Sequence, residues 1–177
     1  RRLGSPAVLD LVDVGAGRGE LLSGVVAAAP SALADRVRAT AIDLRPRPQG
    51  VDERVRWVHG TAPDAVPARV RGLLLAHEWL DDVPLDVVEV DPEGDPRLVL
   101  VDARGVETPG PRLDDDASWL QLGLDPAQAR AWLDRWWPIA GQPPGVRAEI
   151  GRSRDLHWAV AVGRIAAGTA LAVDYGH

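Results

Sequence analysis

The sequence predicts an α/β fold built on an open, mostly parallel sheet, and three observations support this class. An apolar run at residues 8–14 leads into a segment rich in glycine, which is typical of a buried strand followed by a tight turn. A helical pattern of apolar residues follows at once. Further short apolar runs alternate with helical or loop segments, at residues 37–44, 55–59, 73–76 and 169–176. Strands and helices that alternate in this way form parallel sheets with helices on their faces.

Length, charge and composition restrict the classes of function. The chain has 177 residues, of which 46% are hydrophobic, so it can bury the core of one domain. Its net charge of −6 gives no electrostatic support for binding nucleic acid or an anionic membrane. No apolar run approaches the ~20 residues of a membrane span, and the first residues show no signal-peptide pattern. We therefore expect a cytoplasmic protein with neither nucleic acid nor membrane as partner.

A metal site is not expected from the sequence. The chain has no cysteine, so neither a disulfide framework nor a thiolate zinc site can form. Its four histidines are scattered, without the spacing that metal ligands show.

The glycine-rich segment has the pattern Asp13-x-Gly15-x-Gly17-x-Gly19. A dinucleotide-binding fingerprint would place its third glycine at position 20, where Glu20 stands. The pattern instead resembles the first motif of class I S-adenosylmethionine (SAM) methyltransferases, which implies SAM as cofactor. Glycines let the backbone approach a ligand, and the next helix offers free N–H groups to the ligand carboxylate. The alternative is a glycine-rich turn that binds nothing.

Acidic residues at the strand ends suggest further contacts to such a cofactor. Asp13 can bind the ligand ammonium, and Asp43, at the end of the second strand, can accept hydrogen bonds from ribose hydroxyls. Asp43 could instead be an ordinary aspartate that starts a loop. Asp64 could accept from the adenine amino group, or Pro63 and Asp64 could simply start a helix. The predicted cofactor-binding residues are Asp13, Gly15, Ala16, Gly17, Gly19, Asp43, Thr61 and Asp64.

An acidic segment follows the fourth strand, whose end faces the ligand crevice in folds of this class. If a helical turn starts at His77, then Glu78, Asp81 and Asp82 share one face of it. Three acids beside the cofactor would suit a cationic substrate group. The alternative is a solvated helix start whose acids complement the helix dipole.

This segment carries the most specific resemblance in the chain. A fourth strand followed by Asn-Glu-x-Leu-Asp-x-x-Pro is similar to the signature of the MidA family of SAM-dependent methyltransferases, which includes the mitochondrial complex I assembly factor. The chain has Glu78, Leu80, Asp81 and Pro84 at this spacing, and His77 stands in place of the asparagine. The Asp-Tyr-Gly sequence at 174–176 also resembles this family, and the similarity extends over residues 8–177.

The resemblance implies a methyltransferase that acts on arginine in a protein substrate. It assigns catalytic roles to Glu78, which would fix the guanidinium and receive its proton, to Asp81 as helper and to His77. Two other hypotheses stay open, namely a catalytically silent assembly protein that keeps the fold and a methyltransferase for a small molecule. The oligomeric state is also open.

The predicted domain organisation is a single class I SAM-methyltransferase domain, Rossmann-like, over residues 1–177, with an insertion at about 86–145. A β-hairpin is expected at 86–91 and 97–102, a loop at 105–118, and a helix from Pro126. The tryptophans of that helix are expected to pack in a core or a lid, with a partner groove as the alternative. A second helix, at about 153–166 and ended by Gly168, precedes the last predicted strand. The final strands of the fold and the N-terminal region of the family are expected to be missing.

Overall fold

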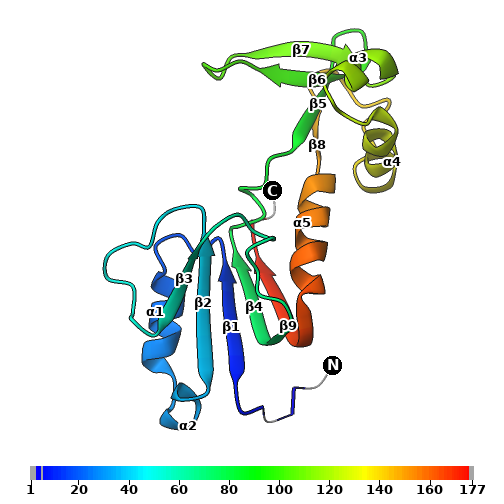
Figure 1. Cartoon of the computed structure of the whole chain (residues 1–177). Coiled ribbons are helices and arrows are strands. Elements are labelled where there is room, and N and C mark those ends of the chain that lie inside the picture. The colour runs from blue at the N-terminus through cyan, green and yellow to red at the C-terminus, as the bar shows by residue number, and fades with distance from the viewer. Residues whose placement is uncertain (1–2, 5, 176–177) are drawn as a thin grey trace. The chain divides into compact units, whose positions relative to one another are not determined.

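The computed structural model describes residues 3–4 and 6–175 (Figure 1). The chain divides into two compact units, one formed by Arg1–Val83 with Leu156–His177 and the other by Pro84–Asp155. The predicted insertion, at about 86–145, lies within the second unit. Each unit has its own sheet and its own hydrophobic core.

The first unit is built on a five-stranded sheet. Its strands are β1 (Leu9–Val14), β2 (Val37–Asp43), β3 (Val55–His59), β4 (Val70–His77) and β9 (Ile165–Val173). Their order is β3-β2-β1-β4-β9, and every neighbouring pair is parallel. The strand order therefore reverses between β1 and β4, which confirms the predicted α/β class. In sheets of this kind, ligands bind beyond the carboxyl ends of the strands at this reversal.

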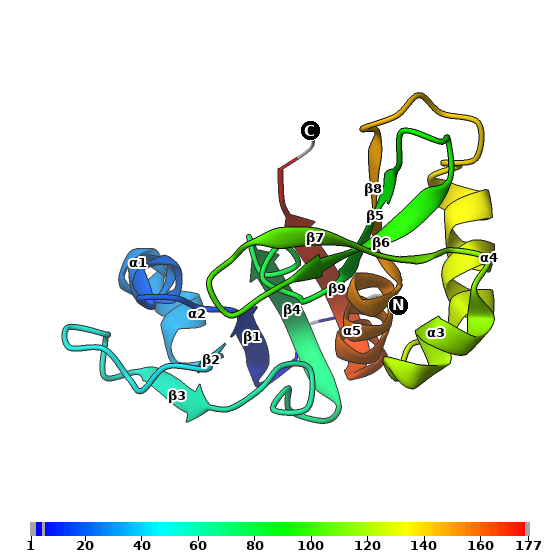
Figure 2. The same cartoon turned by 90° about the horizontal axis from the view of Figure 1, so that it is seen from above.

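Helices cover the two faces of this sheet (Figure 2). On one face, Leu22 and Val26 of α1 (Glu20–Ala28) pack with Leu11 of β1 and with alanines of β2. On the other face, Ala161 of α5 (Arg152–Gly163) packs with Val12. Side chains one residue apart in a strand point to opposite faces, so the apolar residues of β1 supply both cores. A short helix, α2 (Ser31–Ala34), follows α1.

Glycines allow β1, β4 and β9 to pair closely. A Cβ atom on Gly72 of β4 would lie 1.9 Å from the carbonyl oxygen of Asp10, and one on Gly168 of β9 would lie 1.9 Å from that of Gly72. The prediction that Gly168 ends a helix is therefore wrong. Gly168 lies inside β9 with φ of 138°, a conformation that favours glycine. Accordingly, α5 ends earlier than predicted and β9 begins earlier.

The second unit has an antiparallel sheet in the order β7-β6-β5-β8. Its strands are β5 (Asp86–Val90), β6 (Pro96–Val101), β7 (Glu107–Arg112) and β8 (Arg147–Ile150). The pairing of β5 with β6 confirms the predicted hairpin. The loop predicted at 105–118 is wrong, because it contains β7. That strand includes two prolines, which an edge strand tolerates because its outer N–H groups need no partner.

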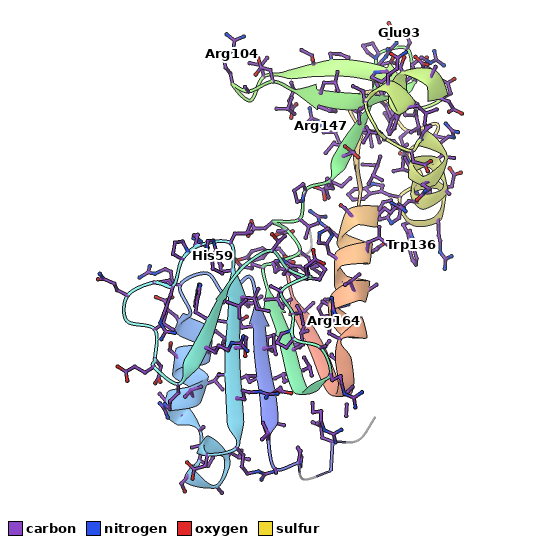
Figure 3. The ribbon with its side chains drawn as sticks, in the orientation of Figure 1. His59, Glu93, Arg104, Trp136, Arg147 and Arg164 are labelled. Atoms are coloured by element: carbon purple, nitrogen blue, oxygen red, sulfur yellow. The ribbon has the colours of Figure 1, made fainter. Side chains whose placement is uncertain are left out.

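Two helices complete this unit, α3 (Asp116–Gln121) and α4 (Pro126–Trp136). Trp119 and Leu133 are buried in its core, where Trp132 packs against them from the edge. Trp136 (Figure 3) and Trp137 are both exposed, so the predicted packing in a core applies to Trp132 but not to these two. No helix within the described part of the chain has the length and apolar character needed to cross a membrane.

Candidate functional site

The shape of the glycine turn after β1 is set by left-handed glycines and by backbone hydrogen bonds to β2. Gly15, Gly17 and Gly19 have φ values of 70°, 60° and 73°, in the left-handed region that costs other residues about 1–2 kcal/mol. The N–H groups of Gly15 and Ala16 both donate to the carbonyl of Ile42 in β2 at 3.0 Å. The turn is therefore anchored to the neighbouring strand and does not depend on a ligand for its shape.

The three glycines have different surroundings. A Cβ atom on Gly15 would lie 2.9 Å from Cβ of Trp79, and one on Gly19 would lie 2.9 Å from Val51. A Cβ atom on Gly17 would meet nothing closer than 3.9 Å, the guanidinium of Arg45. Gly15 and Gly19 are thus required by packing within the protein. Only Gly17 faces open space, as expected of a residue that a ligand approaches.

A pocket of about 380 Å³ lies where the glycine turn meets the end of β4. It brings together six residues that the sequence predicts for the site, namely Asp13, Gly15, Ala16, Gly17, His77 and Glu78. Four further residues line it: Arg18, Glu20, Leu21 and Asp82. The sequence indicated Asp82 only as part of the acidic segment. Arg18, Glu20 and Leu21 could have been proposed as neighbours of the motif glycines at the start of α1.

Asp13 is the buried acid of this pocket. It is 2% exposed, and burial raises the pKa of its carboxyl from 3.8 to about 6, although nearby His77 acts to lower it. Within residues 3–4 and 6–175, no hydrogen bond reaches this carboxylate. Buried carboxylates are normally paired or hydrogen-bonded. No side-chain oxygen or nitrogen of the described residues is fully buried without a partner, so the Asp13 carboxylate is open to the pocket that it lines.

Asp43 lies next to the glycine turn, at the end of β2. Its Oδ2 accepts a hydrogen bond from the N–H of Gly17 at 2.7 Å. Its Oδ1 accepts from the backbone N–H and from Nε of Arg45, at 2.8 and 3.1 Å. Although burial acts to raise the pKa of Asp43, these hydrogen bonds lower it below its usual value. The predicted ribose carboxylate is thus ionised and adjacent to the turn, with Arg45 on one of its two oxygens.

Five of the predicted residues do not line the pocket, namely Asp43, which was described above, and Gly19, Thr61, Asp64 and Asp81. Thr61 and Asp64 are exposed in the turn after β3, and no helix starts there, so the helix-start alternative for Asp64 is wrong. Gly19 is the N-cap of α1 and is packed against Val51. Asp81 lies on the segment after β4 but outside the pocket lining.

The helical turn considered at His77 does not form. Glu78 has a φ of 54°, and bends and turns lead from it to the second unit. A left-handed residue cannot begin a right-handed helix, so the three acids do not share one helix face. Glu78 and Asp82 nevertheless both reach the pocket. There they join Asp13 and Glu20, so four acidic residues line the pocket against one arginine and one histidine, and the lining suits a cationic ligand.

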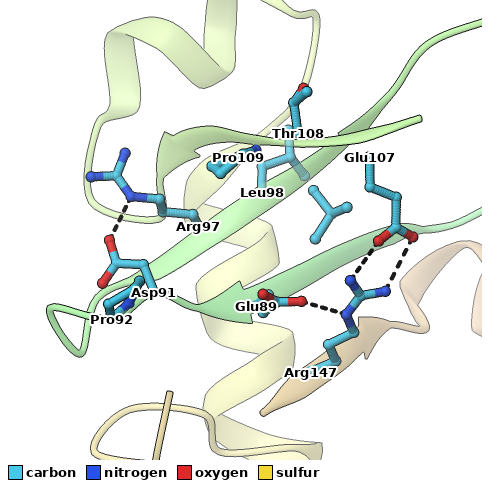
Figure 4. A pocket seen from close by; sticks show the side chains of 10 residues that line it. Glu89, Asp91, Pro92, Arg97, Leu98, Glu107, Thr108, Pro109 and Arg147 are labelled. Atoms are coloured by element: carbon cyan, nitrogen blue, oxygen red, sulfur yellow. Dashed lines mark hydrogen bonds and ion pairs between the residues drawn. The ribbon is translucent and has the colours of Figure 1, made fainter. Parts of the chain in front are cut away.

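The described part of the chain contains no group of three or more His, Cys, Asp or Glu residues that could hold a metal ion. A second hollow, of about 210 Å³, lies on the sheet of the 84–155 unit (Figure 4). There Arg147 donates to Glu89 at 2.5 Å and to Glu107 at 2.5 Å. These ion pairs join β5, β7 and β8, so the charged groups of this hollow satisfy one another.

The fold and the first pocket define an α/β protein with a ligand site at the reversal point of a parallel sheet. A model of the family described as "Putative S-adenosyl-L-methionine-dependent methyltransferase" matches residues 1–177. The chain belongs to this family, whose cofactor is SAM, and the cofactor predicted from the glycine turn is confirmed at that level. No curated protein is significantly similar to the chain.

Two solved structures from Burkholderia thailandensis share this fold. One is a COG1565 superfamily member bound to S-adenosyl-homocysteine, with a TM-score of 0.64 and 23% identity over 96% of this chain. The other is an uncharacterised protein of the same superfamily, with a TM-score of 0.60 and 22% identity over 96% of this chain. The chain spans 42% and 44% of the length of these two proteins, respectively.

Proposed function

We propose that the chain binds SAM in the pocket at the glycine turn and transfers the methyl group to an arginine of a protein substrate, as MidA-type methyltransferases do. One observation carries the SAM-binding part of this proposal, whereas the arginine substrate rests on the resemblance of residues 77–84 to the MidA signature. Asp13 is a buried carboxylate on the wall of that pocket, and no group of the described chain hydrogen-bonds to it. The ammonium group of SAM is a suitable partner. The solved structure that holds S-adenosyl-homocysteine on the same fold supports this choice of ligand.

The residues of the pocket fit the polar groups of SAM. Asp13 would bind the ammonium, and the start of α1, which has no side-chain cap at Gly19, would receive the carboxylate. Asp43 would accept from the ribose. The assignment of Thr61 and Asp64 to the adenine rests on their place after β3, as the sequence predicts.

The proposed reaction requires the substrate guanidinium to lose a proton to a residue of the chain. When bound, SAM supplies a methyl group that is attached to a positively charged sulfur. The S–CH3 bond breaks on transfer, and S-adenosyl-homocysteine, with a neutral sulfur, is the leaving group. The guanidinium, with a pKa above ~12, must lose a proton before its nitrogen can form the new N–C bond. Glu78 would bind the guanidinium and receive this proton. Asp82 lines the pocket, so it is better placed than Asp81 to help.

The substitution Glu78→Gln tests this assignment. We expect SAM affinity, measured by calorimetry, to stay within about twofold of wild type. Methyl transfer from labelled SAM to proteins of a host lysate should fall about 100-fold or more. Asp102→Asn, at an exposed position of the 84–155 unit, is the control. Unchanged turnover in Glu78→Gln would remove Glu78 from the mechanism.

Mass spectrometry of the labelled species should find methylarginine, and label on another residue type would contradict the arginine assignment.

The same experiments separate the other two functions. His77 lines the pocket where the MidA signature has asparagine, and this difference favours a catalytically silent assembly protein. Failure of the wild-type chain to bind SAM would support that function. Label found only in compounds of low mass would support a small-molecule methyltransferase.

A further inference from the structure

The carboxylate of Glu78 is held by a residue from the neighbouring strand. Tyr175 follows β9, which pairs with β4 up to His77 and Val173. Its hydroxyl donates a hydrogen bond to Oε1 of Glu78 at 2.8 Å. Figure 1 shows β4 and β9 side by side. The contact joins two strand ends that are 97 residues apart in the sequence, so it exists only in the folded sheet.

The backbone of Glu78 shows that its position is strongly determined. Its φ of 54° is left-handed, which costs a residue other than glycine about 1–2 kcal/mol. The N–H of Glu78 donates to the carbonyl of Val173 at 2.8 Å, which extends the pairing of the two strands by one residue. Strained residues of this kind persist where the surrounding structure fixes them, and they are common at functional sites.

The two oxygens of this carboxylate have different surroundings. Oε1 accepts from Tyr175 and lies 3.9 Å from Nδ1 of His77. Within the described residues, no hydrogen bond or ion pair to Oε2 is found. Glu78 lines the pocket, whereas Tyr175 does not. One oxygen is thus used within the protein, and the other is left for a ligand.

We propose that Tyr175 is the positioning residue of Glu78, whose carboxylate it holds by one oxygen so that the other is available in the pocket. The consequence for methyl transfer rests on the function proposed above. The interaction also affects the phenol. The hydrogen bond to Glu78 raises the pKa of Tyr175, and the charges of Glu78, Asp174 and Asp81 act in the same direction.

The chain has a single tyrosine, so its titration can be followed without ambiguity. In protein labelled with ¹³C at tyrosine Cζ, nuclear magnetic resonance gives one signal. We expect the wild-type midpoint to lie above that of Glu78→Gln. Asp174→Asn is the matched control, because it removes one nearby charge but keeps an oxygen for the Tyr175 N–H, which donates to Asp174 at 3.0 Å. Circular dichroism at each pH confirms that the variants are folded.

The effect of Glu78→Gln on this midpoint should be at least about twice that of Asp174→Asn, because a hydrogen bond to a charged acceptor adds to the general charge effect. Equal effects would show that Tyr175 senses only the surrounding charge, and would overturn the proposal. So would a wild-type midpoint equal to that of Glu78→Gln.

Methyl transfer supplies the second measurement, with labelled SAM and host lysate as probe. Tyr175→Phe should keep SAM affinity within about twofold and lower transfer about fivefold to tenfold. Because Tyr175 acts through Glu78, the double variant should be no slower than Glu78→Gln alone. Additive losses, or unchanged transfer in Tyr175→Phe, would overturn the positioning role. Absence of transfer by wild type, with the titration as expected, would instead overturn the proposed function and, with it, the role of Tyr175 in transfer.

Discussion

At the scale of single residues, Asp13 has an energetic cost that can be measured. Its pKa in the folded protein, about 6, lies above the ordinary value of 3.8. The folded state therefore holds more protons than the unfolded state between these values, and the free energy of unfolding falls as the pH rises through this range. Above pH ~6 the ionised carboxylate costs about 3 kcal/mol by this difference.

Replacement of Asp13 by asparagine should remove that cost. We expect Asp13→Asn to raise the free energy of unfolding by about 1–3 kcal/mol at pH 8, and to give little or no gain at pH 4. Urea denaturation at the two pH values measures both effects. Asp102→Asn, an exposed position of the other unit, serves as control and should show no such gain. Equal effects of Asp13→Asn at both pH values would show that Asp13 is not the titrating group.

Arg45 gives a second prediction at this scale. Its Nε occupies one oxygen of Asp43, the proposed ribose carboxylate. The Arg45 side chain is 68% exposed, so the ion pair itself contributes little to stability.

We therefore expect Arg45→Ala to strengthen SAM binding about twofold to fivefold, because the ribose no longer competes with the guanidinium. Calorimetry measures the change. Weaker binding in Arg45→Ala would instead mean that this arginine contacts the ligand.

At the scale of elements, substitutions at two glycines of the turn should affect stability and SAM binding differently. Gly15→Ala would force a Cβ atom to within 2.9 Å of Trp79 in a left-handed backbone, so we expect it to lose about 2–4 kcal/mol of stability. Gly17→Ala has the backbone strain without the close contact. It should lose only about 1–2 kcal/mol but weaken SAM binding at least tenfold, because its new methyl group stands in the ligand space.

Thermal denaturation and calorimetry on both variants test this difference. We expect Gly15→Ala to lose more stability than Gly17→Ala. We expect Gly17→Ala to bind SAM more weakly because its methyl group clashes with the ligand. If Gly17→Ala bound SAM as wild type does, the ligand would not approach the turn at that residue.

The elements of the first unit could largely be predicted from the sequence. The strand at 55–59 is found with its predicted bounds, and β1 and β2 lie within or close to theirs, because buried parallel strands are continuous apolar runs between polar ends. Gly168 misled the prediction, since its role is a close approach to Gly72 across two strands. A contact of this kind is tertiary and has no local signal.

The candidate site was predictable in part, for a similar reason. The motif identifies Asp13 and the turn because these residues are neighbours in sequence. The left-handed backbone of Glu78, which replaces the expected helical turn, arises from pairing of β4 with β9. The contact of Tyr175 with Glu78 and that of Arg45 with Asp43 likewise depend on how the strand ends meet, and neither has a sequence signature.

At the scale of the whole molecule, the division into two units predicts where a ligand acts. All residues that line the proposed SAM pocket belong to the Arg1–Val83 and Leu156–His177 unit. Ligand binding stabilises only what it contacts or what unfolds with it. We expect SAM to slow amide hydrogen exchange in β1, β4 and the start of α1, and to leave β5–β8 unchanged. Protection confined to the 84–155 unit would place the ligand in that unit.

The central claim is that the glycine turn and the end of β4 form a SAM site in which Asp13 binds the ammonium. The most direct measurement is a calorimetric titration of SAM into the wild-type chain, Asp13→Asn and Asp102→Asn. The account predicts one-to-one binding to wild type and to Asp102→Asn, and affinity at least tenfold lower in Asp13→Asn, because a charge-assisted hydrogen bond contributes about 1.5–3 kcal/mol. Absence of binding to wild type, or equal binding to all three proteins, would contradict it.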